Sequence, residues 1–449
     1  MAKQEQIKIP PIQLDRLKED ILALSQIGRN EEDRGIYRMA FSDADIEGKA
    51  WLRERIRKAG LEDSLDGAAN LSGLLPGSSD LPRVLVGSHI DTVPCAGALD
   101  GSLGVLVGLE CLRTMRESGY QPQRPIELIA FSDEEGRFGG MFGSQSFCGL
   151  ISPETLFAQD LDGISLHDEM QRHGLDPMEA LDARRDPSTL HAYLELHIEQ
   201  GPVLDRTRKS VGIVDEITGL FKWTVRLKGV ANHAGTTPME MRQDAFMGLA
   251  DFAHEIPRIL EEIGGERSRA TIGRVQILPG AANTVPGLVE FSLDVRDTSD
   301  AILDDLADSV RKALSAVARR RGLLFEFEQA SRIEPVACGE EIVRVLEAQA
   351  DLQQLSALRM PSGAAHDAQI LASLVPVGMI FVPSQEGKSH TPEEWTSWSD
   401  IEAGANLMLG ALRQLAEDTT PSAISEPSAR PPVGSGRRPP RPQPDSIQP

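Results

Sequence analysis

Apolar residues recur at a helical spacing near the start of the chain. Leu17, Ile21, Leu24 and Ile27 lie three or four positions apart within residues 14–59. The pattern is interrupted by "GRN" and by "GIYRMAFS", which have the glycine and polar residues typical of loops. We therefore expect two amphipathic helices joined by a loop in this part of the chain.

A strand, a helix and two further strands are predicted next. "RVLVGSH" (83–89) is a short apolar run, "GVLVGLECLRTMRESGY" (104–120) has helical spacing, and "IELIAFSDEE" (126–135) and "HAYLELHIEQG" (191–201) are again short apolar runs. All three predicted strands end in polar residues. Parallel α/β sheets bind ligands at the carboxyl ends of their strands, so these polar residues should meet at one edge.

The pattern changes to alternating apolar and polar residues after about residue 214. The segments "FKWTVRLKG", "RATIGRVQILPG" and "GLVEFSLDVRD" indicate strands, and they are interleaved with helical patterns at 242–263 and 301–321. This favours a separate α+β domain inserted in the first one. The run "VPVGMIFVPS" and a helical pattern at 399–417 then return to the α/β type.

Chain length supports this division, because 449 residues exceed what one hydrophobic core usually serves. We expect an α/β fold whose main domain, with a mixed and mostly parallel sheet, consists of residues 1–213 and 334–418. The inserted α+β domain would span 214–333. A tail at 419–449, rich in Pro, Ser and Arg, cannot bury a core and should be disordered.

Composition excludes several classes of partner. With 68 acidic and 46 basic residues the net charge is -22, which disfavours nucleic acid and anionic membranes. The first residues have no apolar signal region, and no apolar run is long enough to span a membrane. Four scattered cysteines, without C-x-x-C spacing, favour reduced thiols. We expect a soluble cytoplasmic protein.

Residues able to bind metal stand at the predicted strand ends or in loops: His89, Asp100, Glu134, Glu135, His197 and His390. Imidazole and carboxylate ligands suit zinc, manganese, cobalt or nickel, and a carboxylate such as Asp100 can bridge two ions about 3.5–4 Å apart. Neighbours on an extended segment point in different directions, so Glu134 and Glu135 can supply a base and a ligand.

Each of these residues also has an ordinary structural interpretation. A single His beside a strand is usually a core or surface residue, and "DEE" is usually a solvated turn. Asp100 followed by Gly101 is typical of a turn, and Arg296 between two Asp residues is typical of a surface ion pair. No residue decides the matter alone.

Longer segments resemble one superfamily over nearly the whole chain, to about residue 417. They are "GSHIDTVPCAGALDGSLGVL", "FSDEEGRFGGMFGS", "HIEQGPVLD", "GVANHAGTTPMEMRQDA", "PGAANTVPG", "DVRD", "MPSGAAHDA" and "VPSQEGKSHTPEE". The superfamily is that of dinuclear metallopeptidases, which includes aminoacylases and carboxypeptidase-type enzymes. The resemblance is closer to its hydantoinase/carbamoylase branch of amidohydrolases.

The resemblance implies two divalent metal ions, Zn, Mn, Co or Ni, with Asp100 as the bridging ligand. The implied ligands are His89, Asp100, Glu135, His197 and His390. Asp91 would orient His89 from behind the metal, and Glu134 would be the general base that moves a proton from water to the leaving nitrogen. Peptidase-type relatives tend to have an acidic residue where this chain has His197.

The resemblance also identifies the inserted domain as a lid and dimerisation domain, and so implies a homodimer. His233 would reach the partner subunit's active site and stabilise the oxyanion. The implied substrate-binding residues are Gln200, Asn283, Arg296, Gly363 and Ala364, with His366 and Asp367 as possible orienting residues. Arg296 and Asn283 suit a substrate carboxylate.

Two departures from the family pattern border the expected substrate pocket. The family commonly has Gly where Ala365 stands, and "DEEGRFGGMFGS" is about two residues shorter than usual. We expect hydrolysis of the carbamoyl (ureido) C–N bond of N-carbamoyl-L-amino acids, small molecules with a carboxylate. Allantoate, ureidoglycolate and β-ureidopropionate are the alternatives.

Two other functions have less support. A dipeptidase or aminoacylase would be favoured by an acidic residue at position 197, and the chain has His197 there. A noncatalytic binding or scaffold protein would be expected to have lost Glu134 or a metal ligand, and none is missing.

Overall fold

The larger sheet carries the predicted strand ends. A computed structural model describes residues 9–419, so the tail predicted at 419–449 lies, from residue 420 on, outside the described residues. The sheet has the order β1-β2-β4-β3-β5-β15-β6-β13, with β14 also paired to β6. Its strands are β1 (Glu62–Leu65), β2 (Leu71–Leu75), β3 (Arg83–His89), β4 (Ile126–Phe131), β5 (Leu190–Ile198), β6 (Val211–Ile217), β13 (Val336–Ala337), β14 (Ala357–Ser362) and β15 (Val377–Val382).

Parallel pairing dominates the centre of this sheet. Strands β4, β3, β5 and β15 pair in parallel with their neighbours in that order, whereas β1, β2 and β13 pair antiparallel toward the edges. The central strands are buried almost throughout, as expected for strands covered on both faces. The predicted α/β class with a mixed, mostly parallel sheet is confirmed.

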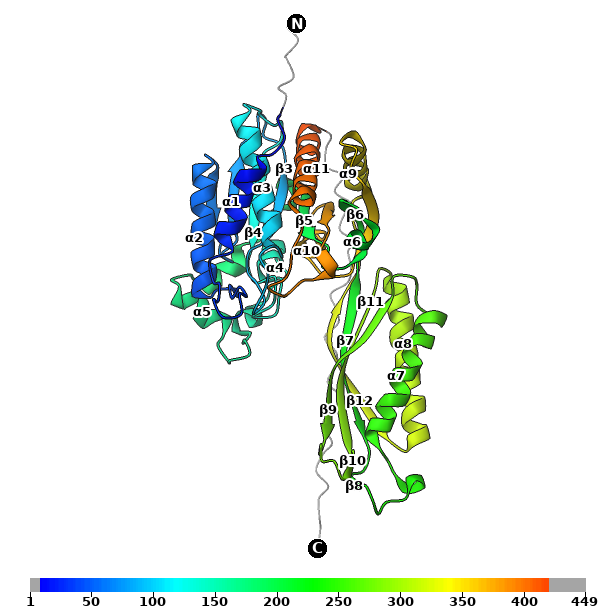
Figure 1. The fold of residues 1–449 in the computed structure, drawn as a ribbon. Helices are drawn as coiled ribbons and strands as arrows, with labels where there is room; N and C mark the ends of the chain where they lie inside the picture. Colours follow the sequence, from blue (N-terminus) through cyan, green and yellow to red (C-terminus); the bar gives the residue numbers. More distant parts are fainter. Residues whose placement is uncertain (1–8, 420–449) are drawn as a thin grey trace. The chain divides into compact units, whose positions relative to one another are not determined.

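Helices cover the larger sheet (Figure 1). They are α1 (Leu14–Leu24), α2 (Asp43–Lys58), α3 (Ser102–Glu117), α4 (Phe142–Cys148), α5 (Leu166–Arg172), α6 (Val203–Thr207), α9 (Glu340–Leu352), α10 (Asp367–Leu371) and α11 (Trp398–Glu417). Helix α3 packs against β3 and β5, and α11 packs against β5 and β15. The helices predicted from apolar spacing are therefore present, and Ser42 and Ser397 cap two of them by accepting a main-chain N–H.

A second sheet has the order β12-β7-β11-β9 and is entirely antiparallel. Its elements, with the two helices that cover one face, are β7 (Gly219–Lys228), α7 (Ala245–Glu262), β9 (Arg269–Leu278), β11 (Leu288–Asp297), α8 (Asp300–Arg321) and β12 (Leu324–Ile333). Two short strands, β8 (Asn232–His233) and β10 (Thr284–Val285), pair separately. This sheet and its helices have their own apolar core, centred on residues such as Trp223, Phe252 and Leu314.

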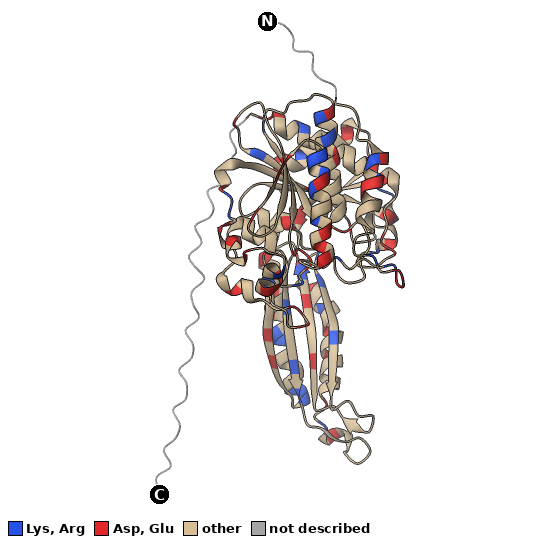
Figure 2. Cartoon of the chain, turned by 90° about the vertical axis from the view of Figure 1, so that its left-hand side faces the viewer, with Lys and Arg blue, Asp and Glu red and all other residues tan. Residues whose placement is uncertain are grey.

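The helix-free face of the second sheet is charged, and Figure 2 shows basic and acidic residues side by side on its strands. Arg226 Nε lies 2.7 Å from Glu290, and Lys228 Nζ lies 2.6 Å from Glu326.

Strand β6 continues in the larger sheet past the predicted boundary at 213/214, and the chain enters the second sheet at Gly219. The division into domains stays a prediction. None of the helices within residues 9–419 has the length and apolarity needed to cross a membrane.

Candidate metal centre

Four neighbouring strands bring the predicted metal ligands together. His89 is the last residue of β3, His197 lies near the end of β5, and Glu135 follows β4. His390 follows β15, and Asp100 lies just before α3. Because β4, β3, β5 and β15 are adjacent and parallel, their carboxyl ends meet at one edge, as the sequence predicts.

Asp100 lies at the centre of the cluster. Its Oδ1 is 3.1 Å from His197 Nε2 and 3.8 Å from His89 Nε2. Its Oδ2 is 3.3 Å from His390 Nε2. The two oxygens of one carboxylate therefore face different histidines, which is the arrangement that a bridging ligand requires.

The glutamate doublet completes the cluster. Glu135 Oε2 lies 3.7 Å from His390 Nε2, and Glu134 Oε2 lies 3.4 Å from His89 Nε2. Ligand atoms in the groups His89–Asp100–His197 and Asp100–Glu135–His390 lie within 4.8 Å of one another.

The donor set and its surroundings fit a divalent metal. Nitrogen and oxygen donors converge, and the buried Oε1 of Glu135 has no hydrogen-bond partner within the described residues. A Cβ at Gly101 would lie 2.3 Å from the His89 ring, so only glycine leaves room for that ring beside Asp100.

Main-chain contacts orient the two buried histidines. His89 Nδ1 donates to the carbonyl of Asp91 at 3.0 Å, and His197 Nδ1 donates to the carbonyl of Ile198 at 2.9 Å. A carbonyl only accepts, so the proton sits on Nδ1 and the Nε2 lone pair faces the cluster, where it can bind metal. In this structure, Nε2 of His197 accepts the Gly101 N–H at 3.2 Å. The Asp91 carboxylate, whose Oδ1 lies 3.7 Å from His89 Nδ1, accepts the N–H groups of Glu134 and Glu135, at 3.4 and 3.2 Å.

Burial and mutual repulsion disturb the acid–base behaviour of the cluster. Burial, together with the charge of Asp100, raises the pKa of Glu135 to about 8. Burial and the charge of Glu135 raise the pKa of Glu134 well above its usual range. Burial alone would lower the pKa of His197, but the nearby Asp100 raises it to about 9. Such a group of carboxylates is stabilised by positive charge, which a metal dication supplies.

Buried Glu394 and half-buried Ser389, which the sequence analysis did not identify, hold the loop of Asp100. Glu394 Oε1 accepts the N–H groups of Leu99 and Asp100, at 2.9 and 3.0 Å. Ser389 Oγ donates to Asp100 Oδ2 at 2.8 Å and lies 3.3 Å from Glu394 Oε2. The polar segment "SHTPEE" (389–394) does not distinguish Glu394 from its exposed neighbour Glu393, because only the fold buries one of them.

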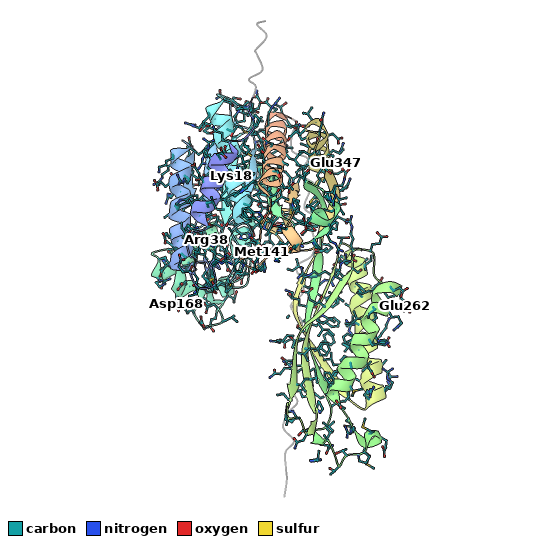
Figure 3. All side chains as sticks on the ribbon, viewed as in Figure 1. Lys18, Arg38, Met141, Asp168, Glu262 and Glu347 are labelled. Atoms are coloured by element: carbon teal, nitrogen blue, oxygen red, sulfur yellow. The ribbon has the colours of Figure 1, made fainter. Side chains whose placement is uncertain are left out.

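Two more buried groups support the cluster from behind. Arg38, labelled in Figure 3, donates to the carbonyl of Ile90 at 2.7 Å and to Ser102 Oγ at 3.0 Å, so it ties the segment after β3 to the start of α3. The His366 ring packs edge-on to the His197 ring with a centroid distance of 4.6 Å. The sequence gives no signal for Arg38, whose partners are mostly main-chain carbonyls.

A cavity of about 760 Å³ opens beside the cluster. Its lining includes the predicted substrate-binding residues Gln200, Arg296, Gly363 and Ala364, together with His390. Arg296 donates to the Gly363 carbonyl at 2.7 Å, and Gln200 Nε2 donates to Asp100 Oδ2 at 2.8 Å. Gln200 and His390 both have φ of 56°, a strained conformation for residues other than glycine that often marks functional sites.

Two predicted residues lie elsewhere. His233 and Asn283 are exposed, on or next to the β8–β10 pair, and neither lines the cavity. They lie near the start of β11, whereas Arg296 lies near its end, and a strand from Leu288 to Arg296 is about 27 Å long at about 3.4 Å per residue. Within one chain, the structure does not bring His233 or Asn283 to Arg296.

The sequence also matches an established family. Residues 85–414 fit the sequence profile described as Peptidase family M20/M25/M40, which is most of the chain. The chain belongs to peptidase family M20/M25/M40. As a member of M20/M25/M40 it is a hydrolase of amide C–N bonds, and its clustered His, Asp and Glu residues form a site for divalent metal.

The named relatives of this M20/M25/M40 chain include members of the hydantoinase/carbamoylase branch that its motifs resemble. It is 38% identical to an N-carbamoyl-L-amino acid amidohydrolase of Geobacillus stearothermophilus, over 90% of this chain and 99% of the relative. It is 35% identical to an allantoate amidohydrolase of Escherichia coli (strain K12), over 89% of this chain and 97% of the relative. The crystal structure of an amidase of the hydantoinase/carbamoylase family from Burkholderia multivorans superposes with a TM-score of 0.85 at 33% identity. The match covers 91% of this chain and 99% of that one. The predicted branch is confirmed.

Proposed function

We propose that this chain hydrolyses the carbamoyl C–N bond of N-carbamoyl-L-amino acids, and that it does so with two divalent metal ions. The cluster around Asp100 carries the proposal. Oδ1 of Asp100 faces His89 and His197, and Oδ2 faces His390, beside a cavity whose lining includes Arg296. Metal ions there would supply Lewis acidity and lower the pKa of water. The names of the relatives support this substrate class.

The residues of the chain have separate tasks in this reaction. Arg296, whose Nε donates to Asp294 at 2.9 Å, would bind the substrate carboxylate through its planar guanidinium. Glu134 takes a proton from the water that adds to the carbonyl carbon. It then gives that proton to the nitrogen of the amino acid as the C–N bond breaks. The released carbamate decomposes to carbon dioxide and ammonia.

A second copy of the chain would complete the site. We infer a homodimer in which one chain's His233 and Asn283 serve the cavity of the other, because about 27 Å of strand separates them from Arg296 within a chain. His233 would then stabilise the oxyanion, and Asn283 would bind the substrate carboxylate.

A cytoplasmic location is proposed from the four free cysteines.

The test is ammonia release by manganese-loaded protein on N-carbamoyl-L-amino acids, allantoate and ureidoglycolate, with dipeptides and N-acetyl amino acids followed by ninhydrin. We expect turnover of the carbamoyl compounds, and a loss of about 10²- to 10⁴-fold in kcat in Glu134→Gln with unchanged metal content. Glu135→Gln, the matched neighbour, should lose metal instead. Turnover of dipeptides alone would overturn the proposal.

Allantoate is the second candidate substrate. The chain is similar to allantoate amidohydrolases of Escherichia coli and Bacillus subtilis at 35% and 32% identity. Allantoate also carries the carboxylate that Arg296 suits. Its turnover above every carbamoyl amino acid would favour this alternative.

A further inference from the structure

A second arginine lines the cavity beside Arg296. We propose that Arg269 and Arg296 together form a site for two anionic groups, so that the preferred ureido substrates carry a second carboxylate, as in N-carbamoyl-L-glutamate or N-carbamoyl-L-aspartate. The inference rests on the proposed function and adds a specificity residue to it. Both arginines lie in the lining of the same cavity as Gln200 and His390.

The two arginines are directly opposite each other in the second sheet. Arg269 on β9 and Arg296 on β11 are register partners in an antiparallel pair, so their side chains leave the same face of the sheet. That face is the one without helices, because the alternate residues Ala270 and Val295 pack into the apolar core. Side chains in such a pair have Cβ atoms about 4.5–5.5 Å apart, and like charges there destabilise the sheet.

The charge of Arg269 is the one that the protein does not neutralise. Arg267, also in the lining, forms ion pairs with Asp215 and Glu216, and Arg296 pairs with Asp294. Arg269 donates only to main-chain carbonyls, those of Glu266 and Ser268 at 2.9 and 2.8 Å. It forms no ion pair with a carboxylate of residues 9–419.

The acidic residues of the cavity lining, Glu199 and Glu266, do not neutralise Arg269. Glu199 uses both carboxylate oxygens to accept the N–H groups of Val203 and Leu204, each at 2.7 Å. Glu266 is exposed, and its carboxylate forms no ion pair within the described residues. An incoming substrate with two carboxylates can therefore place one on Arg296 and the other on Arg269, which relieves the repulsion between the arginines.

The test compares N-carbamoyl-L-glutamate with its neutral isostere N-carbamoyl-L-glutamine, in the wild type, Arg269→Gln, Arg269→Lys and Arg274→Gln. Arg274 is the matched control, because it is on the same strand, exposed and outside the cavity lining, and pairs with Glu290 at 3.4 Å. We expect the wild type to prefer the dicarboxylate roughly tenfold or more in kcat/KM. Arg269→Gln should remove that preference by slowing the dicarboxylate alone, Arg269→Lys should keep part of it, and Arg274→Gln should keep all of it.

Measuring the binding affinity distinguishes a failure of this inference from a failure of the proposed function. Calorimetry on the metal-loaded Glu134→Gln protein measures the affinity for both compounds without turnover, with and without Arg269→Gln. Equal affinity for the two compounds, or an equal loss for both in Arg269→Gln, would overturn the inference and leave the carbamoylase proposal standing. Absence of binding and of turnover for every ureido compound would overturn both.

Discussion

A single carboxylate organises the site at the scale of residues. Asp100 faces three histidines and also accepts hydrogen bonds from Gln200 and Ser389, each at 2.8 Å. Its main-chain N–H is held by Glu394, which is buried although its neighbour Glu393 is exposed. The position of Asp100 therefore depends on a residue almost three hundred positions away in the chain.

Replacing Glu394 by Ala should weaken metal binding. The change leaves the N–H groups of Leu99 and Asp100 without their acceptor, so the Asp100 loop loses its fixed position. Loss of an outer contact of this kind typically costs about 10- to 100-fold in metal affinity, which competition with a chromophoric chelator measures. Glu393→Ala is the control. Equal affinity in the two variants would contradict the prediction.

Close packing of helix on sheet fixes the site at the scale of elements. Helix α3 begins next to Asp100 and lies so close to β5 that a Cβ at Gly104 would be 2.2 Å from the Leu196 carbonyl oxygen. Leu196 precedes His197. The helix start and the strand end that carry two metal ligands are thus in direct contact.

Gly104→Ala should destabilise the protein, and Gly108→Ala should do so much less. The new methyl group at 104 meets main-chain oxygen that cannot move alone, whereas at 108 it meets the end of the Leu128 side chain at 2.8 Å. Overpacking of this type costs about 1–3 kcal/mol in the free energy of unfolding. Chemical denaturation followed by circular dichroism gives the difference. An equally stable Gly104→Ala protein would contradict this view of the packing.

How far the elements could be predicted depended on whether apolar residues made a clear period. Strands β3, β4, β5 and β15 are buried apolar runs and were predictable with their ligands. The edge strand β1 is the largely exposed "EDSL", which has no apolar period to detect. Asp91 shows the same limit at the site: its carboxylate contacts the N–H groups of the glutamate doublet, and only the folded chain reveals that.

At the scale of the whole molecule, the metal-free protein should lose stability as the pH rises from about 6.5 to 9. His197 and His390 have pKa values raised to about 9 by Asp100, above their ordinary 6.5. The stability they contribute is complete below pH 6.5 and is lost as the pH passes 9. Glu135, raised by burial from 4.5 to about 8, adds to the loss, because the unfolded chain ionises it first.

Thermal unfolding in the presence of a chelator, at several pH values, measures this effect. Metal-loaded protein is the control, because a bound dication neutralises the carboxylates and its Tm should vary less over the same range. A metal-free Tm that stays constant or rises between pH 6.5 and 9 would contradict the assigned directions.

A mixture of two inactive variants should regain activity if the proposed dimer exists. Glu134→Gln lacks the base and His233→Ala lacks the residue that serves the partner's cavity. A mixed dimer contains one site with both groups intact. Random exchange of subunits after mixing equal amounts should restore about one quarter of the wild-type sites, measured by ammonia release. No gain over the separate variants would argue against a role for His233 across the interface.

The position of β15 has a consequence for how the chain is made. β15 lies between β5 and β6 in the sheet, yet the entire second sheet separates it from them in sequence. During synthesis, β5 and β6 leave the ribosome with an empty place between them and with unpaired strand edges, which are prone to wrong pairing. Ser389, His390 and Glu394 follow β15. A nascent chain therefore cannot finish its sheet or its metal cluster until β15 and the residues after it have been translated, and metal loading waits for that segment.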